Sequence, residues 1–255
     1  MTASLLGVVG VFFLMLLGAE AGYRAGRRAQ EKDPEGAHSG AGVVEAAVFG
    51  LLGLLLGFAF GGAISRFEAR RALIVTEANA IGTAWLRLDL LPSEEQPAIR
   101  ELFRRYLEAR LSVYEKLPDE AAAREELGRA VRLQDEIWTS AREASPREPG
   151  SPAAILLLPA LNEMFDVATS RTRAAYAHVP GAIIGLLFTV AVLGAILAGH
   201  AMAGGRERKL LHTFLFAGAV SVTLFVILDI EFPRLGFIRL DRADRVLYEL
   251  RDSLK

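Results

Sequence analysis

Charged side chains stand at the ends of two long apolar stretches of this sequence. Asp229-Ile230-Glu231-Phe232-Pro233-Arg234 closes the last stretch, and Arg66, Arg70 and Arg71 follow an earlier one. Carboxylates at this spacing can hold a cation or pair with arginines, and pairing is the commoner outcome where charges border an apolar region. We therefore expect a charge cluster that consists of Arg66, Arg70, Arg71, Asp229 and Glu231.

The sequence lacks the residues that other catalytic or metal-binding sites require. The sequence has no cysteine, which excludes disulfides, thiolate catalysis and cysteine-ligated metal centres. The four histidines, His38, His178, His200 and His212, stand singly, without the paired spacing of a metal-binding helix. A Gly-x-Ser-x-Gly element is missing, and a net charge of -1 gives no basic surface for nucleic acid. We expect no enzyme activity, no metal, no cofactor and no nucleic-acid partner.

Four stretches of the 255 residues are nearly free of charge and predict helices that cross a membrane. They are residues 5–18, 43–64, 179–203 and 210–228. The second is the clearest, because its twenty-two residues contain one ionisable group, Glu45. The predicted fold is an all-α polytopic membrane protein with two helical hairpins. We expect the hairpins at 1–64 and 179–231, a helical extramembrane insert at 65–178 and an extramembrane tail at 232–255.

The two hairpins place both termini and the insert on the same side of the membrane. Basic residues flank the predicted helices on both sides in similar number, so they do not say which side is cytoplasmic. The first apolar stretch also resembles a signal sequence, because Ala19-Glu20-Ala21 has the small-x-small pattern of a cleavage site. No lysine or arginine precedes that stretch, and we expect an uncleaved helix that runs to about Tyr23.

The charged insert shows helical patterning. Residues 66–91 contain no proline and one glycine, so the second membrane helix is expected to continue beyond the bilayer. Ser93, with Gln96 three residues later, is predicted to cap a further helix. Asp119 is predicted to cap the next one. The apolar face of that last helix is expected to hold Leu127, Val131, Ile137 and Trp138.

Glycines recur every four residues within the stretch 43–64. Gly53, Gly57 and Gly61 share one helix face, where small residues let another helix approach closely. The stripe fits two arrangements. The glycines can pack against another helix of the same chain, with Leu54 and Phe58 toward lipid or protein, or the helix can line a pore between subunits.

Three segments are similar to bestrophins and to the bestrophin-like membrane proteins of bacteria. Leu56-Gly57-Phe58, followed by Arg66-Phe67-Glu68-Ala69-Arg70-Arg71, resembles the Leu-Gly-Phe and Arg-Trp-Trp-Glu-Ala-Arg elements of the second bestrophin membrane helix. Phe232-Pro233-Arg234-Leu235-Gly236 resembles the Pro-Phe-Gly segment that follows the last one. Glu77-Ala78-Asn79-Ala80-Ile81-Gly82-Thr83 resembles a segment of the bacterial group.

The resemblance implies a pentameric anion channel of the inner cell membrane, with five copies of the second helix around the pore and a cytoplasmic insert and termini. Its partners would be the lipid bilayer, further copies of the chain and a small inorganic ion. The hydrophobic neck of the family maps onto Phe58, Leu54 and Gly50, of which Gly50 is not bulky, and Phe67 stands where one of two tryptophans is usual. The family's calcium clasp maps onto four carboxylates, Asp229, Glu231, Asp241 and Asp244.

Because fold does not fix function, a second role stays open. In this role the protein is a membrane-anchored scaffold that does not conduct ions. Its membrane part anchors and oligomerises the chain, and its insert binds a partner.

Overall fold

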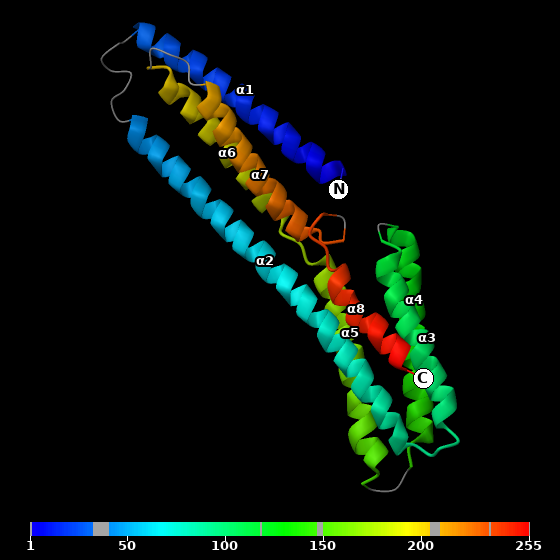
Figure 1. The fold of residues 1–255 in the computed structure, drawn as a ribbon. Coiled ribbons are helices and arrows are strands. Elements are labelled where there is room, and N and C mark those ends of the chain that lie inside the picture. Colours follow the sequence, from blue (N-terminus) through cyan, green and yellow to red (C-terminus); the bar gives the residue numbers. More distant parts are fainter. Residues whose placement is uncertain are drawn as a thin grey trace. The chain divides into compact units, whose positions relative to one another are not determined.

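The computed structural model describes residues 2–32, 41–117, 119–146, 150–204, 210–234 and 236–254. All regular secondary structure in these residues is helical, which confirms the all-α prediction (Figure 1). Four of the described stretches are long and apolar enough to cross a membrane: Leu5–Lys32, Gly42–Leu90, Ala153–Met202 and Leu210–Glu231. The connections at 33–40, which include His38, and at 205–209 lie outside the described residues. The helices form two compact units, Met1–Arg66 with His178–Ile238, and Phe67–Ala177 with Arg239–Lys255.

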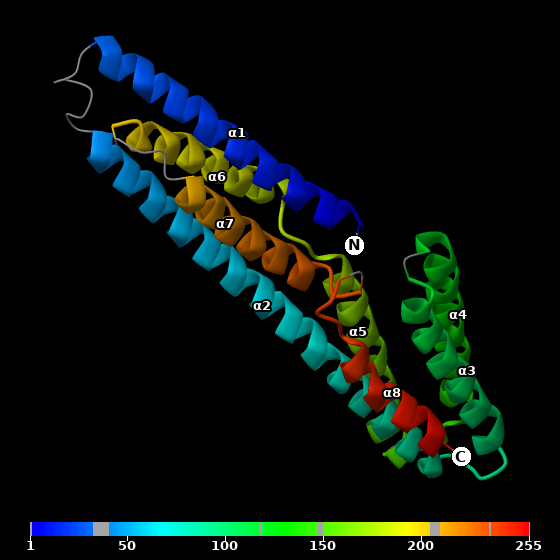
Figure 2. The same ribbon diagram turned by 45° about the horizontal axis from the view of Figure 1, so that its top comes forward.

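The first unit is a helical bundle with an apolar core. It contains α1 (Thr2–Lys32), the first part of α2 (Ala41–Arg87), α6 (Gly181–Met202) and α7 (Leu210–Glu231). α1 lies along α6 in both views (Figures 1 and 2). Core residues from all four helices include Met15, Leu52, Ala191 and Leu224. The rings of Phe49 and Phe216 meet edge to face with centroids 5.5 Å apart, which joins α2 to α7.

A glycine stripe that the sequence analysis did not single out brings α1 onto α6. Gly18, Gly22 and Gly26 recur every four residues along α1. A Cβ at Gly22 would collide with the carbonyl oxygen of Ile196, and a Cβ at Gly199 would collide with the backbone of α1. Small residues join membrane helices through this kind of backbone contact. α1 therefore packs closely on α6 as part of the bundle.

The second unit has its own core of helices. It contains the last part of α2, α3 (Gln96–Glu115), α4 (Glu120–Ala144), α5 (Leu158–Tyr176) and α8 (Asp241–Ser253). Two short segments complete it, the 3₁₀ helix η1 (Leu88–Leu90) and the π-helix η2 (Ala153–Leu157). Ile81, Phe103, Leu107, Ile137 and Met164 are fully buried at the centre of this core.

One predicted helix cap is confirmed and one is wrong. The carboxylate of Asp119 accepts hydrogen bonds from the backbone N–H groups of the second and third residues of α4, at 3.1 and 3.0 Å. α3, in contrast, begins after Glu95, and its predicted cap Ser93 donates to Glu94. The side-chain amide of Gln96 donates to the carbonyl of Leu91 at 2.9 Å, so it stabilises the preceding turn and does not complete a capping box.

The apolar face of α4 also differs from the prediction. Val131 was expected on it but is 49 % exposed. Ile137 is fully buried and Trp138 packs partly buried against the core, as predicted. Ala130 and Leu133, which were not predicted, complete the buried face.

Candidate functional site

One face of α2 within the first unit meets nothing in the described chain. Leu52 and Ala63, on the opposite face, are buried in the bundle. Leu54 and Phe58 are 54 % and 71 % exposed. A Cβ added to any of the stripe glycines would have no neighbour within 4 Å among the described residues; these are Gly53, Gly57 and Gly61. The described part of the chain therefore does not supply the helix that the stripe would meet in an intrachain arrangement.

The predicted neck positions lie beside the glycine stripe. Leu54 and Phe58 are one helical turn apart and project from the same side of α2. A Cβ at Gly50, the third neck position implied by the resemblance, would likewise have no described neighbour within 4 Å. An apolar surface of this kind in a membrane helix must be covered by lipid or by another protein helix.

A partly buried ion pair lies at the end of this unit. The guanidinium of Arg66 donates to Glu231 through Nε and Nη2, at 3.0 and 2.7 Å from Oε2. The Glu231 carboxylate is only 1 % exposed, and it also accepts from the backbone N–H of Val179 at 3.1 Å. The imidazole of His178 lies 3.5 Å from the same carboxylate. Glu231, at the end of α7, is thus joined to α2 and to the segment that precedes α6 by charge-assisted hydrogen bonds.

The other two arginines of the predicted charge cluster have partners in the second unit. Arg70 donates to the carbonyl oxygens of Ala174 and Ala177, at 2.9 and 2.7 Å. A cation at this position compensates the negative end of the α5 dipole and satisfies carbonyls that the helix leaves open. Arg71 lies 3.6 Å from Glu68, and both side chains are mostly exposed.

Asp229 fixes the turn that follows α7. Its carboxylate accepts from the backbone N–H groups of Phe237 and Ile238, at 2.9 and 2.8 Å. A Cβ on Gly236 would collide with this carboxylate, so the turn requires glycine there. The carboxylate therefore acts as an acceptor for backbone groups.

The carboxylates that map onto the calcium clasp do not fit a calcium site. Asp229 binds backbone N–H groups and Glu231 binds Arg66. Asp241 lies 2.8 Å from Arg239, and Asp244 lies 2.9 Å from Arg171. Among the residues that the structure describes, no group of three acidic or histidine side chains could hold a metal. A calcium ion would have to displace several charge-assisted bonds.

The second unit contains a buried charge network that the sequence did not predict. The carboxylate of Glu77, fully buried, accepts from Arg110 and from Arg171, each at 2.5 Å. Arg171 also donates to Asp244 at 2.9 Å and lies 3.9 Å from the ring centre of Tyr114. Only the position of Glu77 within a recognisable motif hinted at a role for it.

The charges of this network compensate one another. Burial alone would raise the pKa of Glu77, but the charges and hydrogen bonds of Arg110 and Arg171 lower its pKa overall. Burial alone would lower the pKa of Arg110, but the charge of Glu77 raises it. Both shifts favour the charged form of the pair, and through Arg171 and Asp244 the network joins α2, α3, α5 and α8.

Comparison with known proteins agrees with this architecture. The chain is similar to crystal structures of a bacterial bestrophin homologue from Klebsiella pneumoniae. One of them shares 19 % identity at a TM-score of 0.68, over 94 % of this chain and 98 % of that chain. A point variant shares 17 % identity at a TM-score of 0.70, over 96 % and 97 %. A structure described only as a membrane protein shares 19 % identity at a TM-score of 0.68, over 96 % and 97 %.

At these low identities, the structural similarity shows only that the fold is shared. Membership of a family requires a match at the level of the sequence. No curated protein matches the chain. The family model of the bestrophin-like domain matches residues 12–244, which covers both units. The chain is an integral membrane protein and belongs to the bestrophin-like family.

Proposed function

We propose that this protein is an oligomeric anion channel of the inner cell membrane, with α2 from each subunit around a central pore. The observation that carries the proposal is the open face of α2, where Leu54 and Phe58 are exposed beside three glycines that meet nothing in the described chain. A small-residue stripe is typical of helix–helix contact and is poorly suited to a surface that faces only lipid tails. Copies of the same chain would cover this face.

The proposed neck would act through the apolar side chains of Leu54 and Phe58. Several copies of these side chains around one axis form a constriction that excludes water when it is narrow. No aspartate or glutamate lies between Glu45 and Glu68 on α2, so the proposed lining has no ring of carboxylates of the kind that cation channels use. This composition, together with the membership of the bestrophin-like family, favours an anion. We place the second unit and both termini in the cytoplasm by the same family argument.

Recordings from the purified protein in planar bilayers test the proposal. Phe58→Ala should raise the single-channel conductance while leaving the oligomer intact, because it removes bulk from the neck. Phe60→Ala is the matched control: Phe60 is 38 % exposed and lies two residues further, about 200° around the helix. The reversal potential in a chloride gradient then reports the sign of the permeant ion.

Two results would count against the neck. Unchanged conductance in Phe58→Ala would remove α2 from the pore wall, and equal changes in both variants would point to a general loosening of the helix.

A membrane-anchored scaffold is the second candidate, favoured by exposed apolar residues of the second unit. Leu86, Ile155 and Leu156 are 68 %, 59 % and 43 % exposed. Arg87 donates to the carbonyl of Leu156 at 2.7 Å, so the two segments that carry them are adjacent. A protein that stays silent in bilayers as an intact oligomer, and forms a complex that Leu86→Ser abolishes, would be a scaffold.

A further inference from the structure

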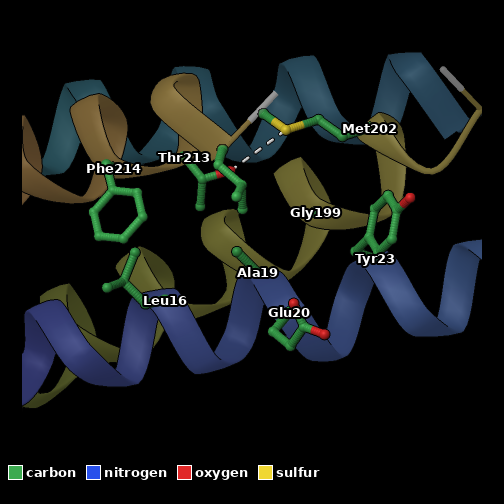
Figure 3. Close-up of a pocket in the computed structure, with 9 residues that line it drawn as sticks. Leu16, Ala19, Glu20, Tyr23, Gly199, Met202, Thr213 and Phe214 are labelled. Carbon is green, nitrogen blue, oxygen red and sulfur yellow. Dashed lines mark hydrogen bonds between the residues drawn. The ribbon is translucent and has the colours of Figure 1, made fainter. Parts of the chain in front are cut away.

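A cavity of about 150 Å³ lies among α1, α6 and α7 of the first unit (Figure 3). Leu16, Ala19, Glu20 and Tyr23 follow one another along α1, opposite Thr213 and Phe214 of α7 in Figure 3. The lining is mostly apolar. A cavity of this size accommodates a benzene-sized apolar molecule, and therefore also a few methylene groups of a lipid chain.

The cavity extends across the level where apolar residues give way to polar ones. Leu16 belongs to the apolar stretch of α1, whereas Glu20 and Tyr23 lie beyond its end. Tyrosine is enriched where a membrane helix reaches the lipid headgroups. The carboxylate of Glu20 lies 2.6 Å from Nε of Arg24, so its charge is compensated and does not repel an anion.

A basic side chain continues the same face of α1. Arg27 follows Leu16 by eleven residues and Tyr23 by four, so it stands one turn beyond the cavity on the cavity side of the helix. Its side chain is exposed. Arg28 is equally exposed but stands about 100° further around the helix, away from the cavity.

From these features we propose that the first unit binds one phospholipid, with an acyl chain in the cavity and the headgroup phosphate on Arg27. Because bulk lipid is as apolar as the cavity wall, the cavity can favour an acyl chain only by fitting it closely. The positive charge of Arg27 complements the negative charge of the phosphate. A lipid with a net negative headgroup should be preferred over a zwitterionic one. The site is independent of conduction, so its test does not depend on channel activity.

The test uses the full chain in detergent and phosphatidylglycerol with a photoreactive group in one acyl chain. We expect cross-links on peptides that contain residues 16–23 and 210–214. Native mass spectrometry of the same samples gives the affinity for phosphatidylglycerol, and phosphatidylcholine serves as the zwitterionic comparison. Cross-links spread evenly over all apolar helices would overturn the proposal, as would equal affinities for the two lipids.

Two variants separate the site from general attraction to a basic surface. Arg27→Gln should weaken phosphatidylglycerol binding about fivefold, the effect of one interfacial cation. Arg28→Gln removes the same charge from the other side of the helix and should leave the affinity unchanged. Thr213→Phe should fill the cavity and remove the cross-links, with unaltered thermal unfolding as evidence that it folds. Equal losses in Arg27→Gln and Arg28→Gln, or cross-links that persist in folded Thr213→Phe, would overturn the assignment.

Discussion

Glu77 binds two arginines of the second unit with one carboxylate, and all three side chains are at most 4 % exposed. Glu77→Ala leaves the charges of Arg110 and Arg171 buried without that counter-ion. We expect the free energy of unfolding to fall by about 3–5 kcal/mol, the usual loss when one partner of a buried pair is removed. Denaturant unfolding followed by the fluorescence of Trp85 and Trp138, both in this unit, measures it.

The matched control for this prediction is Glu68→Ala on the same helix. Glu68 and Arg71 are 56 % and 61 % exposed and 3.6 Å apart, so the loss should stay below about 1 kcal/mol. Losses of similar size in both variants would mean that the buried network does not stabilise the second unit more than a surface pair does.

Tyr248 makes the second unit sensitive to alkaline pH. Its hydroxyl donates to Glu115 at 2.6 Å, and this hydrogen bond together with partial burial raises the pKa of Tyr248 to about 12 from 10.0. The fold therefore favours the neutral phenol. The resulting stability is fully present below pH 10.0 and is lost as the pH rises through about 12. Between these pH values, the midpoint of thermal unfolding should fall less steeply with pH in Tyr248→Phe than in the wild type.

The control for the alkaline effect is Tyr176→Phe in the same unit. Tyr176 is 61 % exposed, and its replacement should leave the wild-type pH dependence unchanged. A Tyr248→Phe profile parallel to that of the wild type would contradict the role of the Glu115 hydrogen bond.

At the scale of helices, the contact of α1 with α6 depends on Gly22. A methyl group there meets the carbonyl of Ile196, and neither backbone can move without separating the helices. Overpacking of this kind lowers the free energy of unfolding by about 1–3 kcal/mol. Gly22→Ala should therefore lower the thermal unfolding midpoint in detergent by several degrees. Gly10→Ala should not lower the midpoint, because Gly10 is an exposed position of the same helix where a Cβ meets none of the described atoms within 4 Å. Equal shifts would show that helix propensity and not close packing is being measured.

The sequence was sufficient for the membrane helices and insufficient for their contacts. A bilayer forces every apolar stretch of this length to satisfy its backbone internally, so hydropathy alone predicts α1, α2, α6 and α7. The cap of α4 was predictable because Asp119 acts within three residues of itself. Glycine spacing was not decisive, since the stripe at Gly22 packs against α6, whereas the equally spaced stripe at Gly57 meets none of the described residues.

The partners of the charged residues near the membrane edge were also hard to predict, because they depend on tertiary packing. Arg66 and Arg70 lie one turn apart on nearly the same face of α2, yet Arg66 binds Glu231 and Arg70 binds the end of α5. The buried network joins residues 77, 110, 171 and 244, which lie far apart in the sequence. Partner choice of this kind depends on tertiary packing that no local pattern encodes.

At the scale of the whole molecule, the two units bury their apolar surface in different ways. The second unit closes a core of its own between amphipathic helices, with Phe103, Leu107 and Ile137 fully inside. The first unit leaves a complete face of α2 uncovered in the described chain, from Leu51 to Ile64. Assembly of several copies of the chain would cover this face, which is our proposal for it.

Assembly through α2 predicts a specific effect of bulk at Gly57. A leucine there meets no other residue of the part that the structure describes, so the subunit should fold, but the leucine should prevent a neighbouring helix from approaching. Size-exclusion chromatography with light scattering in detergent should show an oligomer for the wild type and a monomer for Gly57→Leu. Gly185→Leu, at an exposed glycine of α6 where a Cβ meets no described atom within 4 Å, should keep the wild-type mass. If Gly57→Leu also keeps it, another surface joins the subunits, and the glycine stripe of α2 then faces lipid.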